Sequence, residues 1–143
     1  MPRKVLNCER NHREQYYQKI ADSRFFKGEK DLTHGLNFAI AVAFGYRLDK
    51  FRPLVHGTWI TRVEYIEADT KVKAFFQSIA VAKEKSLKVL LDDDEVYKIA
   101  EGYANGGIIH LYNLFTGEDG GGDFDKEIES QINEVMKKSP RVN

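Results

Sequence analysis

The sequence has little of what stabilises secreted and membrane proteins. It contains a single cysteine, Cys8, so no disulfide can form within the chain. Chains without disulfides are typical of reducing compartments, and we therefore expect a cytoplasmic protein. The first residues are basic but no apolar stretch follows them, so we expect no secretory signal. The longest apolar run, residues 38–44, is seven residues long, far short of a transmembrane helix, and we expect no membrane partner.

Net charge is also absent, because 22 Lys and Arg residues balance 22 Asp and Glu residues. The balance conceals an asymmetry: residues 1–62 carry an excess of six positive charges, and residues 63–143 an equal negative excess. Such a split indicates an anionic partner for the first part of the chain. It is equally consistent with two parts that neutralise each other or simply face water.

Motifs for catalysis, metal binding and phosphate binding are missing. Cys8 and His12 supply only two of the ligands that a zinc site needs, and no second pair follows. The acidic run at residues 92–95 fits the first turn of a helix better than a Mg²⁺ site, because neighbouring carboxylates there point in different directions. The glycine-rich segment 116–125 lacks the lysine of a phosphate-binding loop. We therefore expect a non-enzymatic protein without a metal or a cofactor.

Helical periodicity dominates the remaining sequence. Apolar spacing predicts helices over residues 11–22, 32–46, 70–83, 93–104 with a further helical run to 115, and 125–138, and a short helical turn after Ser86. Asp31 is expected to cap the second helix, and Asp69 or Thr70 the third. Residues 58–66 alternate and are rich in β-branched and aromatic side chains, which fits a short strand or the start of a helix equally well. No second clear strand is present to pair with them.

These elements predict a mostly α fold, a compact bundle of about five to six helices with at most a short extended segment near residues 58–64. We expect a helical domain over residues 1–116, a glycine-rich acidic linker over 117–124 and an amphipathic C-terminal helix in 125–143. The apolar stripe of that last helix is expected to bind a partner, either its own domain or a second copy of the chain, and consists of Ile128, Ile132, Val135 and Met136.

Glycines interrupt an otherwise helical stretch, residues 101–115, at Asn105, Gly106 and Gly107. One interpretation is that the helix ends there with a left-handed residue. The other is that the glycines stay helical and allow a neighbouring helix, such as that around residues 39–43, to approach closely. We favour the second, because apolar residues resume at once with Ile108 and Ile109. The three residues are thus expected to serve helix packing.

Basic and aromatic residues interleave after the second predicted helix. Arg47, Lys50, Arg52 and Arg62 accompany Tyr46 and Phe51 in this region. Basic side chains bind phosphates and aromatic rings stack on bases, so the four basic residues are candidate nucleic-acid contacts. The alternative is a solvated surface without a ligand.

Two segments of the chain resemble a family of small proteins associated with Dnd DNA-phosphorothioation systems. The similarity covers roughly residues 24–115, and its markers are Phe26, Asp31, Ala41, Ala43, Gly45, Glu101, Tyr103, Ala104, Asn105, Gly106 and Gly107. Gly102 stands where that family has an acidic residue. The resemblance implies a role beside DNA modification and defence against foreign DNA, and it carries over no catalytic residues. It makes an accessory protein that contacts DNA, or a DNA-handling partner, our first hypothesis. A self-associating helical interaction module without a nucleic-acid role is the alternative.

Overall fold

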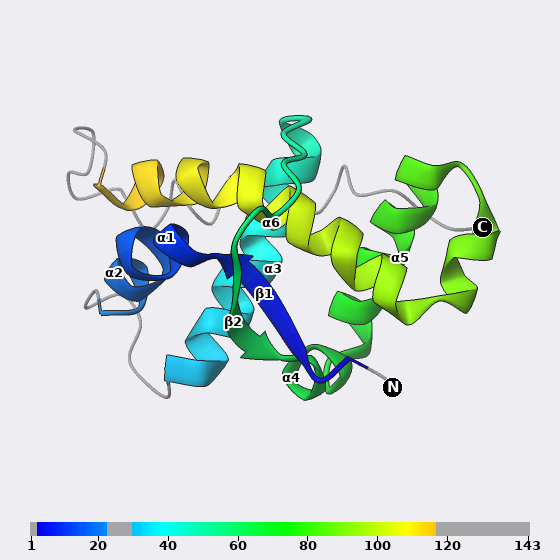
Figure 1. Cartoon of the computed structure of the whole chain (residues 1–143), viewed down its shortest axis with the longest axis horizontal. Coiled ribbons are helices and arrows are strands. Elements are labelled where there is room, and N and C mark those ends of the chain that lie inside the picture. Colours follow the sequence, from blue (N-terminus) through cyan, green and yellow to red (C-terminus); the bar gives the residue numbers. More distant parts are fainter. Residues whose placement is uncertain (1–2, 23–29, 117–143) are drawn as a thin grey trace.

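The computed structural model describes residues 3–22 and 30–116 of the chain. This part is mostly helical with one short two-stranded sheet, which confirms the predicted fold class (Figure 1). The expected linker 117–124 and C-terminal helix, with Ile128, Ile132, Val135 and Met136, lie outside the described residues.

The elements follow one another in chain order as strands, short helices and three long helices. They are β1 (Val5–Glu9), α1 (Arg10–His12), a π-helical turn (Arg13–Tyr17), α2 (Gln18–Ala21), α3 (Lys30–Arg47), β2 (Gly57–Arg62), α4 (Val63–Glu67), α5 (Thr70–Glu84), a 3₁₀ turn (Leu87–Leu91) and α6 (Asp93–Thr116). Among the described helices, none combines the length and the apolar character that crossing a bilayer requires.

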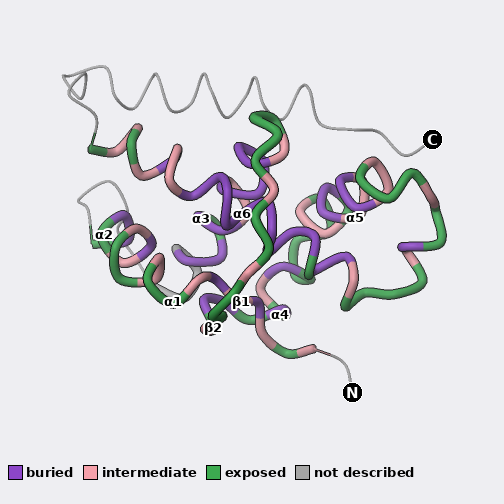
Figure 2. Tube along the Cα trace, turned by 45° about the horizontal axis from the view of Figure 1, so that its top comes forward, coloured by how far each residue is buried: buried purple, intermediate pink, exposed green. Residues whose placement is uncertain are grey.

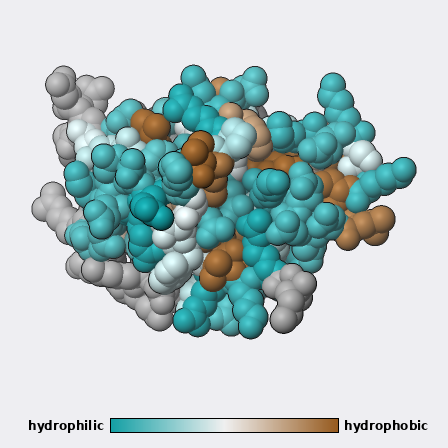
Figure 3. All heavy atoms as spheres, in the orientation of Figure 1, coloured by the Kyte–Doolittle hydropathy of each residue, from teal (hydrophilic) through white to brown (hydrophobic). Residues whose placement is uncertain are grey.

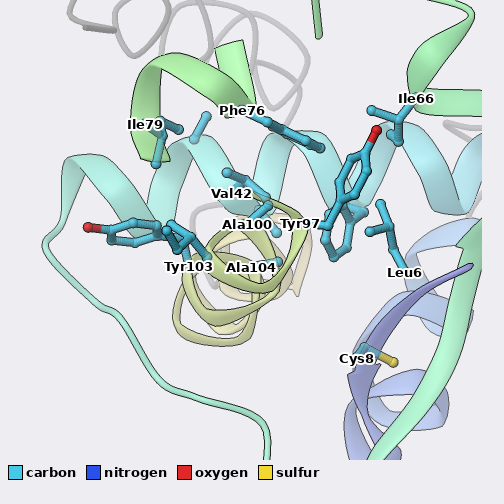
Figure 4. Packing of buried hydrophobic residues seen from close by; sticks show 14 of the residues in the cluster. Leu6, Cys8, Val42, Ile66, Phe76, Ile79, Tyr97, Ala100, Tyr103 and Ala104 are labelled. Carbon is cyan, nitrogen blue, oxygen red and sulfur yellow. The ribbon is translucent and has the colours of Figure 1, made fainter. Parts of the chain in front are cut away.

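The core forms where α3 and α6 cross. Figure 4 looks along α6 and places Val42 of α3 over Ala100 of α6, while Phe76 and Ile79 of α5 cover α3 from the other side. Every residue from 99 to 108 of α6 is buried. A helix that is apolar around its whole circumference must be central, because no side of it can face water without cost.

The sheet consists of β1 and β2 paired antiparallel. β2 is the extended segment that the alternation of residues 58–66 indicates, and the helix α4 follows it directly, so both interpretations of that stretch apply in part. Its partner β1 was missed, although Leu6 and Cys8 of β1 point inward with the alternation of a strand. Leu6 pairs with Thr61 and Asn7 with Trp59, which leaves Ile60 opposite no residue and forms a β-bulge.

Side-chain capping explains where α5 and the 3₁₀ turn begin, whereas α1, α2 and α4 have no side-chain cap. The Asp69 carboxylate accepts hydrogen bonds from the backbone N–H groups of Lys71 at 2.9 Å and Val72 at 3.3 Å, as expected of an N-cap. The prediction for Asp31 is wrong, because α3 begins at Lys30 and Asp31 lies inside it. The first helical segment begins at Arg10, one residue before the predicted start at residue 11, because β1 ends at Glu9.

Candidate nucleic-acid interface

The helix α6 runs without interruption through Asn105, Gly106 and Gly107. Gly107 faces α3 at the crossing: a Cβ there would overlap the Ala41 carbonyl oxygen and lie 2.5 Å from the Gly45 nitrogen. A Cβ on Gly45 would in turn overlap the Tyr103 carbonyl. The two backbones are therefore in direct contact at a position where neither helix can carry a side chain.

Gly102 and Gly106 face a different neighbour, the segment of residues 48–56, which we call the basic loop. A Cβ on Gly106 would overlap the Lys50 carbonyl, and one on Gly102 would overlap the Phe51 ring. The two glycines are one helical turn apart, so they form a strip of α6 without side chains, and the loop packs against this strip. Figure 1 shows the loop crossing in front of α6. The sequence analysis predicts a helix as the neighbour of these glycines, and contact with a loop is an additional finding.

Hydrogen bonds hold the basic loop against this strip of α6. The Lys50 N–H donates to the Gly45 carbonyl at 2.8 Å, and the Arg52 N–H donates to the Gly102 carbonyl at 3.0 Å. The Asn105 side-chain amide donates to the Arg52 carbonyl at 2.9 Å. Asn105 is 7% exposed, so its side-chain amide needs a partner within the protein, and the Arg52 carbonyl is that partner.

The far end of the loop is tied to the end of β1. The Glu9 carboxylate accepts from the backbone N–H groups of Val55 at 3.1 Å and His56 at 2.8 Å. The Arg10 N–H donates to the His56 carbonyl at 2.8 Å. Desolvation opposes ionisation of Glu9, but the two N–H donors outweigh it, so the pKa of Glu9 lies below its ordinary value. A charged Glu9 thus holds the loop against the start of α1.

A basic surface results from this arrangement. Arg47, Lys50 and Arg52 are exposed on or beside the loop, and Arg10 is exposed where its end meets α1. Figure 2 shows the loop exposed over most of its length, and Figure 3 shows that the face carrying it is predominantly hydrophilic. Two carboxylates, Glu9 and Asp49, lie within the same segments, and Glu9 is occupied by the loop backbone.

The surroundings of His12 show that α1 lies close to the basic loop. Burial is the main cause that lowers the pKa of His12; the Glu9 charge opposes this, and the positive charge of Arg52 lowers the pKa further. His12 of α1 therefore lies within electrostatic range of Arg52 on the basic loop, although forty positions separate the two residues in the sequence. Arg10 and the loop belong to one surface, which sequence reasoning missed because it depends on β1.

Arg62 does not join this surface. It lies at the opposite end of β2 from the loop, about 16 Å from Gly57 at the rise of an extended strand. There its Nη1 approaches Glu64 Oε1 at 3.3 Å, and both side chains are exposed. The structure thus brings together three of the four candidate phosphate contacts and separates Arg62 from them.

A second polar site lies around Glu101, at the start of the glycine stretch. Its Oε1 is 2.5 Å from Arg3 Nη1, and its Oε2 accepts from the Asn7 N–H at 2.6 Å. Burial raises the pKa of Glu101 above its ordinary value, and Arg3 and Asn7 counteract this shift only in part. A cavity of about 350 Å³ adjoins it, lined by residues that include Phe51, Lys83 and Lys98. Because Oε2 binds Asn7 of β1 and Oε1 pairs with Arg3 just before the strand, Glu101 positions β1 on α6.

The acidic run at the start of α6 serves local and tertiary contacts. Asp92 Oδ1 accepts from the Glu95 N–H at 3.3 Å, as a helix cap does. Asp94 Oδ1 lies 2.7 Å from Arg3 Nε, and Asp93 lies 3.9 Å from Lys73. Among the residues that the structure describes, no three His, Cys, Asp or Glu side chains gather as metal ligands would.

Comparisons of this chain with protein-family models, curated proteins and solved structures found no match. The resemblance to Dnd-associated proteins therefore stays a prediction, and the case for a function rests on the geometry of the basic surface.

Proposed function

We propose that this protein is a non-enzymatic accessory factor that binds nucleic acid through the basic loop. The observation that carries the proposal is the fixed course of the loop: its backbone is hydrogen-bonded to α3, to α6 and to Glu9, while Arg47, Lys50 and Arg52 are exposed. Arg47, Lys50 and Arg52 lie within six consecutive residues that turn at Asp49, whose φ is 54°, so the three cations are close enough along the chain to contact neighbouring phosphates of one strand.

A loop held in this way offers cations at defined positions. Fewer backbone conformations are lost on binding than with a free loop, so more of the electrostatic attraction appears as affinity. Arg10 adds a fourth cation at the end of the loop. The chain as a whole is neutral, so attraction has to come from this local surface, and the affinity for phosphates is expected to depend steeply on salt.

The resemblance to proteins of DNA-phosphorothioation systems supplies the biological setting of the proposal. An accessory protein that follows the phosphate backbone is suited to a system that modifies or surveys DNA. The alternative module, which self-associates through the helix in 125–143, concerns residues outside the described part, and no contact of the described residues favours it.

The test is a salt series of nucleic-acid affinity, measured by fluorescence anisotropy with labelled single strands and duplexes. Wild-type protein is expected to bind with an affinity that falls linearly in the logarithm of salt concentration. The variant Lys50→Gln/Arg52→Gln should bind more weakly and lose roughly one to two units of the logarithmic slope, close to one for each contact.

The matched control is Lys71→Gln/Lys88→Gln, which changes the net charge by the same amount on exposed residues of α5 and the 3₁₀ turn. This control and the single variant Arg62→Gln should keep the wild-type slope. Absence of salt-dependent binding to both single strands and duplexes would overturn the proposed function. Equal losses in the loop variant and in the control would exclude the loop as the binding surface.

A further inference from the structure

Trp59 is the only tryptophan of the chain, and 43% of its surface is exposed. The cause is the bulge in β2. Because Ile60 has no partner on β1, both Ile60 and Thr61 turn inward, and Trp59 and Arg62 on either side of them remain outside. Bulges often re-aim a side chain beside a functional site. An indole exposed to this degree is available to stack against an aromatic group of a ligand.

Arg13 of the π-helical turn lies over this indole. Its guanidinium carbon is 4.4 Å from the centre of the ring, and its Nη1 donates to the Trp59 backbone carbonyl. The contact holds the cation in a stacked position against the aromatic system. An exposed indole paired with a half-buried guanidinium is thus present on the molecular surface.

The pair lies close to the end of the basic loop. Trp59 is two residues from Gly57, where β2 starts, and Arg13 is one turn along the helical segment from Arg10, whose N–H binds the His56 carbonyl. An aromatic platform and a row of phosphate-binding cations therefore adjoin each other. This is the combination that proteins use to bind single-stranded nucleic acid without sequence preference.

We propose that Trp59 and Arg13 form a base-stacking site and that the nucleic acid bound by this protein is single-stranded. This inference rests on the proposed function. In a duplex the bases are stacked on each other, so an indole at the surface has no base face to contact, whereas an unpaired base can lie flat on it. A neutral chain with a small basic surface is also poorly suited to duplex DNA, which usually requires a strong positive bias.

The test uses the intrinsic fluorescence of Trp59 together with anisotropy. Oligothymidine and a duplex of the same length are titrated into the full chain at low salt. We expect tighter binding of oligothymidine and quenching of Trp59 fluorescence by it, with little quenching by the duplex or by heparin. Trp59→Ala should lower the affinity for oligothymidine by about tenfold to a hundredfold, the range of one stacked base, and leave weak duplex binding unchanged.

Trp59→Phe is the matched variant, because it keeps an aromatic face and fills much of the same space; it should recover most of the affinity. Thermal melting of both variants shows whether they fold, and the quenching of wild-type protein tests the site without any substitution. Duplex binding as tight as that of oligothymidine, or oligothymidine binding without quenching, would overturn this inference while leaving the proposed function standing. No binding of either probe would overturn both.

Discussion

Replacing Gly106 by alanine should destabilise the fold, although alanine is the better helix former. The helix gains about 1 kcal/mol from the replacement. Against this gain, the new Cβ would overlap the carbonyl group of Lys50 and lie 2.8 Å from the Lys50 Cβ. Backbone atoms cannot rotate away as a side chain can, so the basic loop must move off α6.

The cost follows from what that movement breaks. The hydrogen bonds from the Arg52 N–H to the Gly102 carbonyl and from Asn105 to the Arg52 carbonyl would lengthen or be lost, at about 1 kcal/mol each. Overpacking adds roughly 1–3 kcal/mol. After subtraction of the helix gain, we expect the free energy of unfolding to fall by about 2–4 kcal/mol, a large share of the roughly 5–15 kcal/mol typical of a domain.

Urea unfolding followed by circular dichroism measures this change. The midpoint should fall at an unchanged slope, because the loss is one of stability and not of compactness. Gly35→Ala is the matched control in α3: its Cβ would lie 3.1 Å from Thr61 Oγ1, a contact that a shift of a few tenths of an ångström relieves without moving a loop, so the change should stay within about 1 kcal/mol of zero. A Gly106→Ala protein as stable as wild type would refute the proposed contact between loop and helix.

Three further changes test the same architecture. Asn105→Asp replaces an amide donor by a carboxylate that faces the Arg52 carbonyl in a buried position. The melting temperature should therefore fall further than with Asn105→Ala, which we expect to lower the free energy of unfolding by about 1–3 kcal/mol. A lower melting temperature for Asn105→Ala than for Asn105→Asp would contradict this expectation. Thr61 is 1% exposed and its hydroxyl has no hydrogen-bond partner among the described residues, so Thr61→Val should stabilise the protein by about 1 kcal/mol in urea unfolding, and a clear loss would show that the hydroxyl is satisfied. The pKa of Glu9 is lowered in the folded protein from 4.5, so the stabilising contribution of its charge is present above that value and is lost as the pH falls through the folded pKa. The difference in the free energy of unfolding between wild type and Glu9→Gln should therefore shrink in acid. A difference that does not depend on pH would refute the role given to the charge.

Local signals were sufficient for the long helices and for the Asp69 cap, but not for the start of α3, where the Asp31 prediction was wrong. The Asp69 cap depends on two N–H groups within three residues of it, and the apolar spacing of α5 and α3 repeats every three to four residues. Residues near one another in sequence determine such features, so periodicity and capping chemistry predict them. The helical glycines of α6 belong here too, because uninterrupted apolar residues on both sides already favour a continuous helix.

The candidate interface depends on contacts between distant parts of the chain. Arg10 meets the basic loop only because β1 pairs with β2 across some fifty residues, and Trp59 is exposed only because the pairing leaves Ile60 over. A one-residue change of register would turn Trp59 to the other face. Of the four candidate basic residues, three therefore share one surface, and Arg62 lies apart from them.

The sequence by itself determined a mostly α protein and a glycine stretch that favours close packing of helices. Only the tertiary structure decided that Gly102 and Gly106 contact a loop, that hydrogen bonds hold this loop in place on α6, and that an arginine lies over the single tryptophan beside it. The physical reason is range: backbone propensities and side-chain spacing act within a few residues, whereas the register of a sheet and the docking of a loop are set by packing between segments that the sequence keeps apart.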